Sequence, residues 1–94
     1  MGALAVDTQG HINDVAIMQD GVVYCLPRPQ RHCHVIMMMS YRYGVKPPIT
    51  GTQGFLAPDG RFMDRVEALA YALSSGQIEA PKFQKNALFS EDLW

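Results

Sequence analysis

Short apolar runs bounded by turn residues occur in two pairs along the chain, and this pattern predicts two β-hairpins. Residues 15–18 and 22–26 flank Gln19-Asp20-Gly21, and residues 55–57 and 61–63 flank Pro58-Asp59-Gly60. Asp-Gly between β-rich runs is typical of a hairpin, and Gly60 supplies the positive φ that such a turn needs. Pro27 ends the second strand because proline cannot donate to a sheet ladder. Residues 3–7 are expected to add a short edge strand.

A longer apolar stretch between the hairpins has helical spacing. The predicted helix runs from Pro29 or Gln30 to Tyr43, and Gly44 stands where a left-handed C-terminal cap is needed. Its expected buried face consists of Val35, Ile36, Met39 and Tyr43. Residues 50–54 are polar and glycine-rich, which favours a connection or turn over a phosphate-binding loop.

A second helix is predicted directly after the second hairpin. Asp64 is its expected N-cap, and Glu67 completes a variant of the capping box. Its apolar positions recur at i, i+3, i+4 and i+7, which predicts a buried face of Val66, Leu69, Ala70 and Leu73. The helix is expected to end at residues 74–76. The tail, residues 81–94, carries enough apolar residues to predict that it docks on the body: Phe83, Leu88, Phe89, Leu93 and Trp94.

These elements predict one α+β domain over residues 1–94. It comprises a small, mostly antiparallel sheet of two hairpins, two helices packed on the sheet, and an ordered C-terminal tail. Hydrophobic residues make up 48% of the chain, which is sufficient for a small core. No apolar run approaches the roughly 20 residues of a membrane span, and the N-terminus lacks the features of a signal peptide. We therefore expect a cytoplasmic protein.

The most distinctive chemistry lies in residues 28–34, which contain Arg28, Arg31, His32 and His34. This stretch is expected to enter the first helix, with Pro29 at the first helical position. A helix N-terminus presents free backbone N–H groups and the positive end of the helix dipole. Arginines and histidines at such a place predict a pocket for an anion. The net charge of −1 makes duplex nucleic acid an unlikely partner.

Helical geometry divides the histidines of this stretch. Arg28, Arg31 and His32 would share one face, whereas His34 would point toward Met38 and Tyr41. An acid/base pair of His32 with His34 would require an irregular first turn or a neighbouring chain. His11 is the other candidate for a second histidine.

An arginine clamp with a titratable histidine suits the binding or metal-independent cleavage of a phosphodiester. The candidate catalytic residues are His32, His34 and His11. The candidate ligand-binding residues are Arg28, Arg31, Tyr24 and Arg61. In the structural alternative, His32 packs at the helix end, the arginines are solvated, the tyrosines belong to the core, and Arg61 pairs with a nearby carboxylate.

A metal site and a cofactor are not expected. Cys25, His32, Cys33 and His34 lack the spacing of zinc ligands, and three of them are consecutive. The two cysteines are expected to be reduced thiols, with at least one of them buried. Residues 51–54 lack the Gly-Lys-Ser/Thr of a P-loop.

Several short motifs together resemble a family of short proteins encoded by tailed phages and prophages. The resemblance covers most of residues 15–94, and its motifs are Arg31-His32, Gln53-Gly54-Phe55, Gly60-Arg61-Phe62, Asp64-Arg65, Gly76-Gln77-Ile78 and the closing residues 88–94. Small phage proteins often oppose host defence, and one class binds or cleaves nucleotide immune signals. By analogy, the resemblance implies action in the host cytoplasm as a homo-oligomer.

Three hypotheses follow. The first is an enzyme that cleaves a cyclic dinucleotide without metal. The second is a sponge that sequesters a cyclic nucleotide or a cyclic ADP-ribose-type signal unchanged. The third is a protein–protein module that inhibits a host enzyme, with the Met-rich helix and the aromatic tail as its contact surface.

Overall fold

The computed structural model describes residues 10–94, so the strand expected at residues 3–7 lies outside the described part. The elements follow the predicted order and confirm the α+β class. They are β1 (Asp14–Gln19), β2 (Val22–Pro27), α2 (His32–Tyr43), β3 (Thr52–Leu56), β4 (Phe62–Asp64), α3 (Arg65–Ser74) and the 3-10 helix η1 (Ser90–Asp92).

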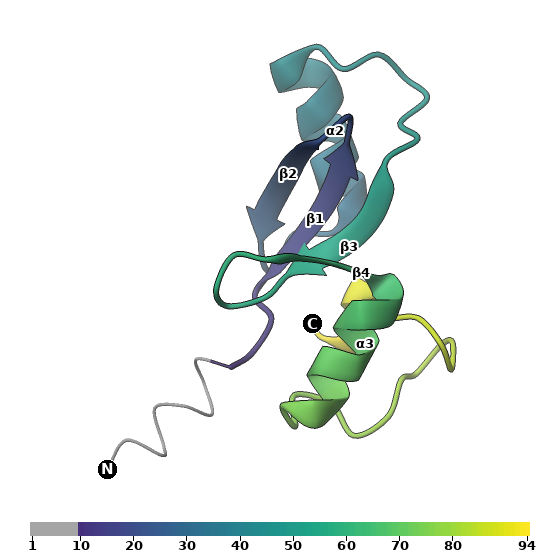
Figure 1. Ribbon diagram of the computed structural model, residues 1–94. Helices are drawn as coiled ribbons and strands as arrows, with labels where there is room; N and C mark the ends of the chain where they lie inside the picture. The colour runs from purple at the N-terminus through teal and green to yellow at the C-terminus, as the bar shows by residue number, and fades with distance from the viewer. Residues whose placement is uncertain (1–9) are drawn as a thin grey trace.

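The four strands form one antiparallel sheet in the order β2-β1-β3-β4. The two predicted hairpins are therefore joined through the pairing of β1 with β3. Helix α2 packs on β1 and β2, and α3 packs on β3 and β4. Figure 1 shows α2 behind the sheet and α3 at its lower end, beside the yellow C-terminal segment.

Both hairpin turns have the backbone that their sequences predict. Asp20 and Gly21 have φ values of 54° and 78°, so both central residues of the first turn are left-handed. Two such residues in a two-residue loop match the right-handed twist of the flanking strands. Gly60 has a φ of 90° in the second turn.

The core is organised by one row of side chains that crosses all four strands. Pairing aligns Val15 with Leu26 on one side and with Phe55 on the other, and Phe55 is aligned with Met63. Aligned residues point to the same face of a sheet. This face is covered by both helices, whose buried side chains are His32, Val35 and Met39 in α2 and Ala68, Leu69 and Ala72 in α3.

Helix α2 begins later than its sequence suggests. The N–H of Gln30 donates to the carbonyl of Pro27 over 3.1 Å, which closes a turn across Pro29. Arg31 then has extended backbone and serves as the N-cap, so the first helical residue is His32. Gly44 ends the helix with the predicted left-handed φ, 69°. Tyr43 is 58% exposed and does not belong to the buried face.

Helix α3 has the predicted cap but a different buried face. Oδ1 of Asp64 accepts hydrogen bonds from the N–H groups of Val66 and Glu67, and Glu67 accepts from the N–H of Asp64. The buried residues are Ala68, Leu69 and Ala72, whereas the predicted Val66, Ala70 and Leu73 are exposed. The small side chains of the alanines allow α3 to lie close to the sheet. This close contact determines which face of the helix is turned toward the sheet.

Strand β3 begins at Thr52, so residues 52–54 are strand rather than the predicted connection. Gly54 explains the difference, because it lies against the backbone of β4. A Cβ atom at this position would come 2.0 Å from the carbonyl oxygen of Met63. The glycine therefore marks a close approach of two strands.

The C-terminal tail is ordered, as predicted. Leu88 is fully buried, and its N–H donates to the carbonyl of Arg65 over 3.0 Å. At the other end of α3, the side chain of Gln77 both donates to and accepts from the backbone of Ile12. These bonds fasten the segment before β1 and the tail to the same helix.

Replacing Gly54 by alanine should destabilise the protein by about 3 kcal/mol, because the β3 and β4 backbones would have to separate. Thr52→Ala is a matched control in the same strand, since Thr52 is exposed. Denaturant unfolding measures the stability of both variants, and an unchanged m-value would show that their unfolding can be compared directly. Equal stability of the two variants would contradict the close approach.

Candidate functional site

Arg31 is used to hold the C-terminal segment. Its guanidinium donates to Oγ of Ser90 over 2.9 Å and to the backbone oxygen of Trp94. It also lies 3.9 Å from the carboxylate of Glu91. The indole N–H of Trp94 in turn donates to the carbonyl of Gln30 over 3.0 Å. The tail thus occupies the anion-binding side of Arg31.

His32 points into the core and is only 7% exposed. Its Nε2 lies 2.8 Å from the carbonyl oxygen of Gly54, and its ring meets Phe55 edge-on at 5.1 Å. A carbonyl can only accept, so Nε2 carries the proton in this bond. Burial lowers the pKa of His32, which the bond to Gly54 opposes only in part. This imidazole is neutral and linked to the backbone of β3.

His34 is exposed, whereas His32 is buried. Its Nδ1 accepts the backbone N–H of Arg31 over 2.9 Å. This bond reaches back from the third helical residue to the N-cap, as a Glu or Gln does in a capping box. The exposed imidazole therefore caps the start of α2.

The remaining predicted site residues belong to other segments of the chain. Arg28 is exposed in the turn before α2, and His11 precedes β1. Tyr24 lines a groove at the edge of β2, and Arg61 lines a different cavity beside α3. The backbone N–H of Arg28 donates to the carbonyl of Asn13, in the segment that carries His11, whereas Tyr24 and Arg61 line different openings. The catalytic and ligand-binding roles stay predictions.

Residues 10–94 contain neither a cluster of metal ligands nor a helix suited to crossing a membrane. No three His, Cys, Asp or Glu side chains in this range are close enough to hold a metal ion. None of its helices combines the length and apolarity that crossing a bilayer requires.

An aromatic cavity of about 400 Å³ lies in the C-terminal segment, and the sequence reasoning did not single it out. Phe83, Gln84, Phe89 and Glu91 line it. The two phenyl rings meet edge-on at 6.3 Å, and the guanidinium of Arg65 lies 4.3 Å from the centre of the Phe89 ring. The signal in the sequence is the apolar tail, which predicts docking on the body and, in the third hypothesis, a contact surface for a host enzyme.

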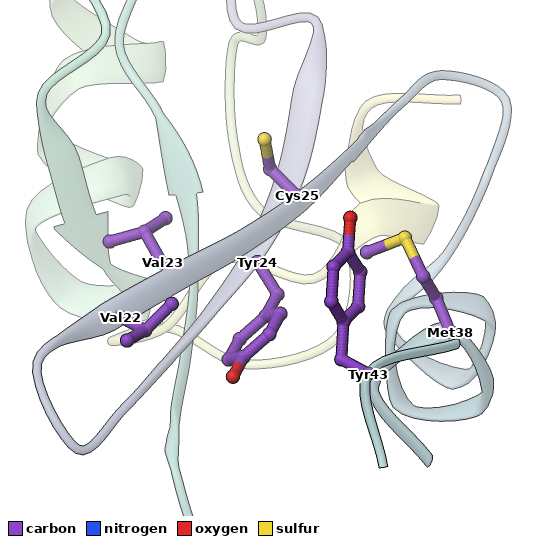
Figure 2. A pocket seen from close by; sticks show the side chains of 6 residues that line it. All are labelled: Val22, Val23, Tyr24, Cys25, Met38 and Tyr43. Atoms are coloured by element: carbon purple, nitrogen blue, oxygen red, sulfur yellow. The ribbon is translucent and has the colours of Figure 1, made fainter. Parts of the chain in front are cut away.

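A second opening, of about 370 Å³, follows the outer edge of β2. It is lined by Val22, Val23, Tyr24, Cys25, Met38 and Tyr43. Figure 2 shows Val22 and Tyr24 on one side of the strand and Val23 and Cys25 on the other, with Tyr43 and Met38 of α2 alongside. The rings of Tyr24 and Tyr43 meet at 5.5 Å. Burial raises the pKa of the Cys25 thiol, and the charge of Asp14 adds to this effect.

These features define a small α+β protein in which His32, His34 and Arg31 at the start of α2 are hydrogen-bonded within the fold, and in which the C-terminal segment carries an aromatic cavity. The chain belongs to the Phage T4 y16D protein family, whose model matches residues 7–94. Comparisons with curated proteins and with solved structures found no match.

Replacing Arg31 by methionine should release the C-terminal segment, because methionine keeps the apolar stem but loses the bonds to Ser90 and Trp94. Trp94 is the sole tryptophan of the chain, so its fluorescence reports on this docking. We expect red-shifted emission, easier acrylamide quenching and a loss of about 1–3 kcal/mol of stability. Arg28→Met, at an exposed position, should leave the emission unchanged. Identical spectra for the two variants would contradict this role of Arg31.

Replacing His32 should reveal its bond to Gly54. His32→Leu leaves the carbonyl without its donor and should cost about 1–3 kcal/mol. His32→Gln retains an N–H donor and should cost less. Denaturant midpoints near pH 8 measure both.

The pH dependence of stability should also depend on His32. Its pKa is lower in the folded state than in the unfolded state, so the unfolded chain binds the proton more readily. The contribution of neutral His32 to the free energy of unfolding is then fully present above about pH 7. It decreases as the pH falls through about 6.5, the pKa of a histidine in the unfolded chain. His32→Gln should flatten this slope, whereas His11→Gln should retain it. An unchanged slope in His32→Gln would rule out His32 as its source.

Proposed function

We propose that this phage-family protein opposes host defence by sequestering a nucleotide-derived immune signal without cleaving it. The observation that carries the proposal is the cavity formed by Phe83, Gln84, Phe89 and Glu91. Its volume of about 400 Å³ lies within the range of small-ligand sites. Aromatic rings, an amide and a carboxylate are the groups that recognise a nucleobase.

The two phenyl rings supply the stacking surface. Phe83 is 62% exposed, which is unusual for so large an apolar side chain unless a ligand or partner covers it. Arg65 lies against the ring of Phe89 and donates to the carbonyl of Leu88, which fixes this part of the segment. A base stacked on such a ring contributes about 1–3 kcal/mol of binding energy.

The polar groups favour a purine with adjacent N–H donors, such as guanine. The carboxylate of Glu91 accepts hydrogen bonds, and the amide of Gln84 both donates and accepts. Within residues 10–94, the polar contacts of the Glu91 carboxylate are weak ones, with Ser90 Oγ at 3.3 Å and Arg31 at 3.9 Å. The exposed residues Lys82 and Lys85 flank Gln84 in the sequence and provide positive charge for phosphate groups.

Sequestration is preferred to cleavage because of the state of His32. A general acid or base must reach the substrate, whereas His32 is buried and bonded to a backbone carbonyl. Cleavage by His34 or His11 is the alternative, and the experiment described next would detect its products.

The experiment is calorimetric titration with cyclic di-GMP, cyclic di-AMP, mixed cyclic dinucleotides and cyclic ADP-ribose isomers in EDTA. The ligand is then recovered by heat denaturation and analysed by chromatography. We expect a guanine-containing ligand to bind and to be recovered intact. Phe83→Ala should weaken its binding by about tenfold or more. Val66→Ala is the matched control, because Val66 is also 62% exposed but lies on α3.

Other outcomes separate the alternatives. Glu91→Gln should weaken guanine ligands more than adenine ligands, provided that Trp94 fluorescence shows a docked tail. New products would support the enzyme hypothesis. Binding that is insensitive to Phe83→Ala would place the ligand elsewhere. The absence of binding by every ligand would leave the protein–protein module.

A further inference from the structure

The outer edge of β2 is the most unusual surface of the sheet. Within residues 10–94, strand β2 pairs with β1 on one side and with no strand on the other. Its sequence, Val-Val-Tyr-Cys-Leu-Pro, contains no charged residue. Monomeric proteins usually protect such edges with charges, bulges or cover, because an open edge adds further strands. Here Val22 and Val23 are 48% and 39% exposed.

The turn geometry determines which backbone groups point outward. A two-residue loop with left-handed Asp20 and Gly21 closes on a hydrogen-bonded pair, here Gln19 with Val22. Pairs then alternate, so Tyr24 and Leu26 bond to β1, and the N–H and C=O groups of Val23 and Cys25 point away from it. Within residues 10–94, neither residue takes part in a backbone bond outside the sheet.

We propose that this edge pairs with β2 of a second copy of the chain in an antiparallel arrangement, with Tyr24 on the two-fold axis. Val23 then exchanges N–H and C=O bonds with Cys25 of the partner, and Cys25 does the same with Val23 of the partner. The two sheets become one continuous sheet. A closed dimer of this kind removes the open edge.

The position of the axis follows from the ends of the strand. An axis at Cys25 would pair Val23 with Pro27, which has no N–H to donate. An axis at Val23 would pair Cys25 with Gly21, whose left-handed backbone belongs to the turn. Only an axis at Tyr24 uses strand residues alone and leaves Pro27 outside the bonded pairs.

The surroundings of the edge suit a second copy better than a charged or extended segment of another protein. The groove beside the edge is lined by apolar and tyrosine side chains from β2 and α2, with no charged side chain among them (Figure 2). A two-fold axis perpendicular to the sheet keeps both α2 helices on the same face. Met38 and Tyr43 of each copy would then face Val22 and Tyr24 of the other, and the groove would fill with side chains of matching character.

The first test is the mass of the protein in solution, measured by light scattering over a range of concentrations. We expect a dimer of twice the 10.5 kDa chain mass. Val23→Pro removes an outward N–H without touching the bonds to β1, and it should give a folded monomer by circular dichroism. Val23→Thr keeps the N–H and should stay dimeric.

The second test maps the axis by oxidative cross-linking in a Cys25→Ser/Cys33→Ser background. Tyr24→Cys places two thiols directly opposite each other and should give a covalent dimer. Val22→Cys should not, because in this register the two copies of residue 22 are about 14 Å apart. In the native chain the two Cys25 residues are about 8 Å apart, beyond disulfide reach, so the dimer is non-covalent.

A monomer at every soluble concentration would overturn the proposal. So would a dimer that persists in Val23→Pro without cross-linking at residue 24, since its interface must then lie elsewhere. If Val23→Pro fails to fold, the contrast between Tyr24→Cys and Val22→Cys decides alone. Cross-linking of both to the same extent would contradict the register.

Discussion

The start of α2 is the point at which three distant parts of the chain are held together. Arg31 bonds to the C-terminal segment through Ser90 and Trp94, and His32 bonds to the middle of β3 through the carbonyl of Gly54. The extended N-cap directs Arg31 outward to the tail, whereas the first helical residue directs His32 into the core. Because β3 pairs with both β1 and β4, the histidine fixes the helix against the whole sheet.

This role limits the chemistry of the stretch. A catalytic histidine must reach its substrate and exchange protons near neutral pH. His32 is buried with a lowered pKa, and His34 uses Nδ1 to cap the helix. In the sequence, the Arg/His pattern suggests a phosphate site. In the structure, Arg31, His32 and His34 find their hydrogen-bond partners within the protein. The exposed aromatic and polar groups that line a cavity lie instead in the C-terminal segment.

The parts of the fold that were predictable depend on local rules. The Asp20-Gly21 turn, the Asp64 cap and the Gly44 cap are each determined by residues within one turn of the chain. The features that the sequence predicted wrongly, or did not predict, depend on contacts between residues far apart in the chain. Residues 52–54 become a strand because Gly54 admits the backbone of β4, and Arg31 finds Ser90 at a separation of 59 residues. Neither contact leaves a periodic signal, so a single sequence could not reveal them.

The same connections show why the two proposed surfaces are compatible. Glu91 lines the aromatic cavity and lies on the 3-10 helix that Arg31 holds, but its contact with Arg31 is a half-exposed pair at 3.9 Å, which is weak. A ligand that takes this carboxylate leaves the bonds to Ser90 and Trp94 in place, so it need not undock the tail. The tail packs against α3, which covers the β3–β4 side of the sheet, whereas the free edge of β2 is at the opposite side. The proposed pairing through β2 would therefore leave the cavity of each copy open, so each chain would be able to bind the proposed ligand independently of the other.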